Sequence, residues 1–112
     1  MHYQPIKLSE ELSKFNDHWS PKLIGEMNDN QFKIVKIAGD YEWHVHHETD
    51  KLFFVIEGEM IIDFRDGQVR ISKDEMFIVP KGLEIKPSSE KECHIMLMEP
   101  RSEIYTAGTE SA

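Results

Sequence analysis

The sequence predicts an all-β fold, a sandwich or barrel of short strands preceded by one short helix. Between residues 32 and 98, seven short runs rich in apolar residues have the length and the period-two patterning of strands. Turn-forming pairs such as Asp66-Gly67 separate neighbouring runs, as in hairpins. No helical pattern lies between the runs, which excludes a parallel sheet with helical crossovers.

The expected strands are spaced by roughly 8–12 residues, as in small sandwiches and barrels. They cover residues 32–38, 41–46, 52–56, 60–64, 69–71, 76–79 and 93–98. The run 52–56 is apolar on both faces and is therefore expected to be central. Leu12 and Phe15, three residues apart, indicate the short helix. We expect one domain, residues 1–112, with an arm and helix over 1–31, the barrel over 32–100 and a tail over 101–112.

Composition narrows the classes of function. The 112 residues contain 13 Lys and Arg against 21 Asp and Glu, which gives a formal net charge of −8. Such a chain repels phosphate backbones and anionic lipids, so we expect no nucleic-acid partner and no membrane contact. No apolar run approaches the ~20 residues of a membrane helix. The lone Cys93 cannot form an internal disulfide, which favours a reducing compartment and a cytoplasmic location.

Two stretches resemble the sequence motifs of the cupin family. In the first, His44 and His46 match a His-x-His pair and Gly58 matches the closing glycine, whereas Lys51 stands where the family has glutamate. In the second, residues 80–82 match a Pro-x-Gly centre, and Ile85 stands at the histidine position. The chain resembles small single-domain bacterial cupins of the mannose-6-phosphate-isomerase-like subgroup. This resemblance implies a double-stranded β-helix, or jelly-roll barrel.

His44 and His46 are two residues apart on an expected strand, so both imidazoles share a face and could reach one metal ion. Alternatively, they are ordinary pocket histidines bonded to their neighbours. The resemblance implies a glutamate and a histidine as the remaining ligands, but Lys51 and Ile85 offer no lone pair to a metal. The sequence therefore predicts a degenerate metal site that binds Zn, Ni, Mn or Fe weakly if at all.

The first functional hypothesis is a barrel that binds a small polar or anionic molecule, with the cation of Lys51 beside the two histidines. In the alternative placement, Lys51 points to solvent and pairs with Asp50 or Glu48. The expected ligand pocket consists of His44, His46, Lys51, Phe53, Met60, Ile85 and Met96.

A second hypothesis is a metal-dependent isomerase or oxygenase in which Asp50, Glu48 or His47 completes the site around His44 and His46. A third is a homodimer with a structural barrel, because exposed edge strands need to be covered. Residues 32–38 and the N-terminal arm are the expected contacts. The sequence identifies no catalytic residue for any of the three hypotheses.

Overall fold

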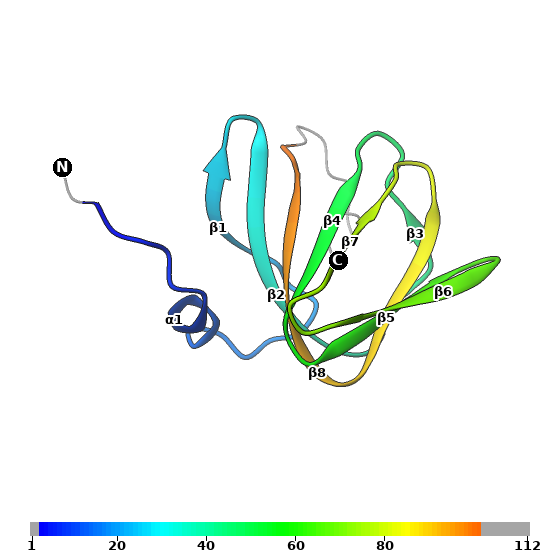
Figure 1. Ribbon diagram of the computed structural model, residues 1–112, viewed down its shortest axis with the longest axis horizontal. Coiled ribbons are helices and arrows are strands. Elements are labelled where there is room, and N and C mark those ends of the chain that lie inside the picture. Colours follow the sequence, from blue (N-terminus) through cyan, green and yellow to red (C-terminus); the bar gives the residue numbers. More distant parts are fainter. Residues whose placement is uncertain (1–2, 102–112) are drawn as a thin grey trace.

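The computed structural model describes residues 3–101. These residues form one short helix and eight strands, which confirms the all-β prediction (Figure 1). The elements are α1 (Leu8–Leu12), β1 (Lys22–Met27), β2 (Asn30–Asp40), β3 (His44–Val45), β4 (Lys51–Glu57), β5 (Glu59–Phe64), β6 (Gly67–Ser72), β7 (Met76–Val79) and β8 (Glu84–Pro100). Within this part of the chain, no helix is long and apolar enough to cross a membrane.

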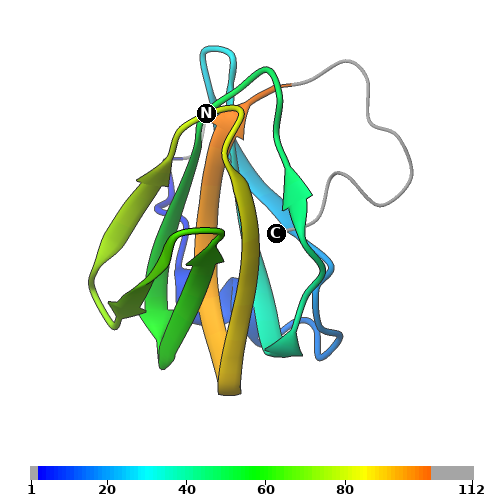
Figure 2. The same ribbon diagram turned by 90° about the vertical axis from the view of Figure 1, so that its right-hand side faces the viewer.

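The long strand β8 joins the two halves of the barrel. Its C-terminal half pairs with β2 and β4 in the strand order β1-β2-β8-β4-β7. Its N-terminal half pairs with β3 and β5, and β5 pairs in turn with β6. All of these pairings are antiparallel, and Figure 2 shows how the strands curl around a common interior.

The structure corrects two expectations about strands. Residues 22–27 form β1, which the sequence did not predict because a bulge between Leu23 and Gly25 interrupts its alternation. Residues 84–92 belong to β8, although Pro87 and its polar neighbours look like a loop in sequence. Consequently the run 32–38 is not an edge, since β2 lies between β1 and β8. The ends of the five-strand order are β1 and β7.

The interior is filled by apolar side chains that point inward from every second position. Along β4, Phe53 and Val55 are completely buried, while their neighbours Leu52 and Phe54 are only partly buried. The core cluster comprises Val35, Ile37, Phe53, Val55, Met60, Ile62, Ile71, Val79, Ile85, Cys93, Ile95 and Leu97. This alternation assigns each residue of β4 and β8 to the inner or the outer face of the sheet, and it therefore determines the direction in which the side chains of the site residues point.

Candidate functional site

Lys51 lies inside the molecule. It occupies the first position of β4 and shares the inner face with Phe53 and Val55, and its side chain is 1% exposed. The alternative placement, in which Lys51 points to solvent and pairs with Asp50 or Glu48, is therefore wrong. The Asp50 carboxylate instead accepts a hydrogen bond from the backbone N–H of Lys81 at 2.9 Å.

A buried carboxylate accompanies this lysine. Nζ of Lys51 lies 3.7 Å from Oε2 of Glu99, and Nζ of Lys33 lies 3.9 Å from the same oxygen. Glu99 is 5% exposed on its side chain, and Lys33 is 12% exposed. Burial lowers the pKa of Lys51 to about 8, and the charge of Glu99 opposes this shift only in part.

Sequence reasoning missed Glu99 and Lys33. Glu99 continues the inward positions of β8 after Ile95 and Leu97, and Lys33 lies opposite Leu97 in the register of β2 with β8. A charged residue at the end of an apolar strand is usually exposed to solvent. Both residues therefore looked like solvated strand ends in the sequence. If the alternation of Ile95 and Leu97 is extended by two residues, it places Glu99 on the inner face, and this is the signal that would have identified Glu99.

His44 and His46 lie in and just after the two-residue strand β3, with their ring centroids 5.0 Å apart and their planes at 90°. Nδ1 of His44 lies 2.9 Å from the backbone oxygen of Glu42. Because a carbonyl oxygen only accepts hydrogen bonds, Nδ1 carries the proton, and in the neutral ring the lone pair is on Nε2. The Nε2 atoms of both histidines are buried.

Aromatic rings continue outward from this pair of histidines. Tyr41 contacts His44 edge-on, with a centroid separation of 5.3 Å, and Trp19 stacks on Tyr41 at 4.8 Å. The indole N–H of Trp19 donates to the backbone oxygen of Ala38 at 3.0 Å.

The other expected pocket residues separate into two groups. Phe53, Met60 and Ile85 are fully buried in the core cluster, and Ile85 is the cross-strand partner of His44. Met96 does not join them. It lies between the inward positions Ile95 and Leu97 of β8 and therefore points to the outer face of the sheet. Sequence analysis placed Met96 on the wrong side because it gave β8 the opposite phase.

These residues do not fit a metal ion. His44 and His46 offer two nitrogen donors, but at the other two ligand positions Lys51 brings an ammonium group and Ile85 an apolar side chain. His47, Glu48 and Asp50, the alternative donors, are exposed. Among residues 3–101, no group of three or more His, Cys, Asp or Glu side chains is arranged to hold a metal.

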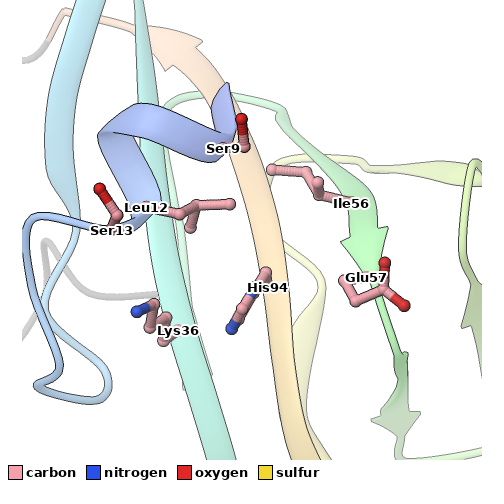
Figure 3. A pocket seen from close by; sticks show the side chains of 7 residues that line it. All are labelled: Ser9, Leu12, Ser13, Lys36, Ile56, Glu57 and His94. Carbon is pink, nitrogen blue, oxygen red and sulfur yellow. The ribbon is translucent and has the colours of Figure 1, made fainter. Parts of the chain in front are cut away.

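Two of the grooves along the sheet bear on the site. One, of about 410 Å³, is at the end of β4 and β8 and is lined by Asn30, Glu48, Thr49, Asp50, Lys51, Leu52, Ile78, Lys81, Met98, Glu99 and Pro100. The other, of about 340 Å³, lies between α1 and the outer face of the sheet, where Leu12 points from the helix toward the strands (Figure 3). Lys51 and Glu99 line the first groove and not the second, so the first is the relevant one for the buried lysine.

One family model and several solved structures of known proteins match this chain. The family model described as "Cupin domain" matches residues 32–98. The chain is 49% identical to a cupin-2 domain containing protein from Shewanella frigidimarina, with a TM-score of 0.85 over 86% of this chain and 94% of that one. It is 38% identical to protein NMB1881 from Neisseria meningitidis, with a TM-score of 0.80 over 88% of this chain and 100% of that one.

Other similarities are more limited. The structure of KdgF from Halomonas sp. is 21% identical with a TM-score of 0.64, over 74% of this chain and 79% of that one, and it supports the fold alone. The uncharacterized protein YdbB of Bacillus subtilis is 40% identical over 60 residues, which are 53% of each protein. The chain thus spans about half the length of this curated relative. The mannose-6-phosphate-isomerase-like subgroup stays a prediction.

Proposed function

The chain belongs to the cupin family, and from that premise we propose that it binds a small polar or anionic molecule in its barrel, with Lys51 as the cationic contact. The observation that carries this proposal is the burial of the Lys51 side chain, 1% exposed, on the inner face of β4. Lysine is among the residues least often found fully buried, because removing its charge from water is costly.

A buried lysine with a lowered pKa is characteristic of functional sites. Burial lowers the pKa of Lys51 to about 8, and the Glu99 carboxylate, 3.7 Å away, opposes this shift only in part. A carboxylate or phosphate oxygen bound beside this amine would favour its charged form.

The histidines support a polar ligand as well. Donation from Nδ1 of His44 to the Glu42 carbonyl leaves Nε2 as a hydrogen-bond acceptor in the neutral ring. We propose that the core residues Phe53 and Ile85 form the apolar walls beside these polar groups, because small-molecule sites combine apolar walls with few polar contacts.

Thermal unfolding with a panel of anions tests this proposal. Phosphate, acetate, malonate and citrate are compared for the wild type and for Lys51→Met, with Lys73→Met as the control, because Lys73 is 57% exposed. We expect at least one anion to raise the Tm of the wild type and of the control but not of Lys51→Met. Equal responses in all three proteins, or no response to any anion, would contradict the proposal.

We also propose that a second copy of this chain covers the outer face of the sheet. Met76 and Ile78 on the terminal strand β7 are 60% and 53% exposed, and they pair with Phe54 and Leu52 of β4. An apolar band beside an open strand edge is typical of an interface. The extended arm before α1, where Tyr3 is 87% exposed, projects from the body of the molecule (Figure 1) and offers a second apolar contact.

Sedimentation equilibrium tests the dimer. We expect the wild type to be dimeric at micromolar concentration and Ile78→Lys to be monomeric, with an unchanged far-ultraviolet circular dichroism spectrum. Lys73→Met serves again as the surface control and stays dimeric. A wild type that sediments as a monomer at these concentrations would rule the dimer out.

A further inference from the structure

We propose that the amine of Lys51 reacts reversibly with the carbonyl group of a small 2-oxo acid and forms an imine. This inference rests on the proposed binding function and specifies it, because it gives the ligand both a carboxylate and a reactive carbonyl. It assigns to Lys51 a covalent role in addition to charge recognition.

The geometry around the amine supports this assignment. Nζ of Lys51 lies 5.7 Å from the ring centroid of Phe53, so an apolar face borders it. Oε2 of Glu99 lies 3.7 Å away on the neighbouring strand β8. Amines become nucleophilic when an apolar environment or a neighbouring cation disfavours their protonated form, and here Lys33, at 3.9 Å from the same oxygen, provides the neighbouring cation.

The protonation state agrees with this geometry. Burial lowers the pKa of Lys51 from 10.5 to about 8, Lys33 lowers it further, and Glu99 opposes the shift. At pH 7.5 this change increases the neutral fraction of the amine by roughly two hundred-fold over an ordinary lysine. Because a less basic amine is also a weaker nucleophile, we expect the reaction rate to increase about tenfold or more rather than by the full factor.

The reaction balances without an oxidant or reductant. The neutral amine attacks the carbonyl carbon, the new C–N bond forms, and the carbonyl oxygen takes up a proton to give a carbinolamine. Loss of this hydroxyl group with one proton breaks the C–O bond and releases water, which leaves the imine. Glu99 is placed to accept the proton from nitrogen and to return it to the leaving hydroxyl group.

The same cluster adds positive charge near the acid group. Lys33 is 12% exposed, and its ammonium lies 3.9 Å from Oε2 of Glu99, so it attracts the carboxylate of an acid bound at Lys51. Lys51 and Glu99 also line the groove of about 410 Å³, a volume in the range of small-molecule sites and ample for a two-carbon or three-carbon acid.

Reductive trapping tests the proposal on the full-length wild-type chain. Glyoxylate is added with sodium cyanoborohydride at pH 7.5, whose hydride reduces any imine to a stable secondary amine, and the modified lysine is identified by peptide mass mapping. We expect one adduct per chain at Lys51, formed at least tenfold faster than at the exposed Lys73 of the same molecules. Lys51→Arg, which keeps the charge, should lose this fast adduct.

Glycolate, which has the same carboxylate but no carbonyl group, separates the two proposals. If glyoxylate and glycolate both raise the Tm but Lys51 is labelled no faster than Lys73, the imine is refuted and the binding function stands. If neither acid raises the Tm and no fast label forms, both are refuted for this class of ligand. Because trapping is measured in the wild type, the result does not depend on the folding of a variant.

Discussion

Nζ of Lys51 lies 3.7 Å from Oε2 of Glu99, and both side chains are almost completely buried on the inner face of the sheet. This relationship links β4 to β8 at the end where both strands border the groove of about 410 Å³. It replaces a metal–carboxylate contact, which the cupin resemblance implies at position 51, by a contact between an ammonium and a carboxylate group.

The lowered pKa of Lys51 predicts a stability that rises with pH. The pKa is about 8 in the folded chain against 10.5 for an ordinary lysine, so between these values the unfolded state binds more protons and stability increases. The full difference corresponds to about 3 kcal/mol as an upper value. Urea unfolding of the wild type and Lys51→Met from pH 7.5 to 10.5 measures it. We expect the wild type to gain stability relative to the variant across this window, and parallel curves would contradict the assignment.

Glu92 predicts that stability also rises with pH, here in the acid range. Its carboxylate lies 2.8 Å from Nε2 of His18 and 2.9 Å from Nε2 of His94, and these hydrogen bonds lower its pKa from 4.5 to about 2. A group with a lowered pKa of this kind contributes stability above pH 4.5 that is lost as the pH falls through about 2. We expect the stability difference between the wild type and Glu92→Gln to shrink over this window. Glu90→Gln, a change at an exposed neighbour on β8, is the control, and its difference should not follow the same course.

Gly58 and Gly39 form a matched pair for testing the turn between β4 and β5. Both have positive φ, +88° and +78°, but a Cβ at Gly58 would lie 3.2 Å from the Glu92 backbone oxygen, whereas one at Gly39 would meet nothing within 4 Å. We expect Gly39→Ala to lower the free energy of unfolding by about 1 kcal/mol through backbone strain alone. Gly58→Ala should cost roughly 1–3 kcal/mol more because backbone atoms must also move. Denaturant unfolding at one pH measures both, and equal losses would show that the contact is unimportant.

Restoring the missing ligands should create a metal site. Lys51 and Ile85 both face the interior, 1% and 0% exposed, and Ile85 pairs with His44. We expect the double variant Lys51→Glu/Ile85→His to retain about one Zn or Ni ion per chain after dialysis against a weak chelator, since it provides four donors. Elemental analysis of untagged protein measures the metal content. The control is the variant Lys51→Glu/His44→Ala. Stoichiometric metal in the wild type would contradict the conclusion that its donor set does not fit a metal ion.

Much of the fold follows from patterns that are local in sequence. The short apolar run 52–56 and the Asp66-Gly67 turn predicted strands that the structure contains, because short buried strands and hairpins are determined by nearby residues. The edge strand β1 could not be predicted in this way, since a bulge shifts its phase at Gly25. The first half of β8 was missed because Pro87 weakens any strand pattern, although its neighbours Ile85 and Ser89 pair normally.

The site was only partly accessible to the same reasoning. The motif match located His44, His46 and Lys51, but the direction in which Lys51 points depends on the register of β4 with β7 and β8. Glu99 lies 48 positions away in the chain (99 − 51 = 48) and meets Lys51 only when the barrel forms. A contact at such a separation is a property of the topology, and no local pattern around either residue contains it.

The central role of β8 has a consequence for how the chain folds. Four strands, β2, β3, β4 and β5, find a pairing partner in this one segment, which is the last strand among residues 3–101. Without β8, the strands β2, β4 and β5 keep only their partners β1, β7 and β6, and their apolar faces cannot close around an interior. The barrel is therefore completed only when β8 joins it, and a folding intermediate that lacks β8 is the species in which we expect aggregation.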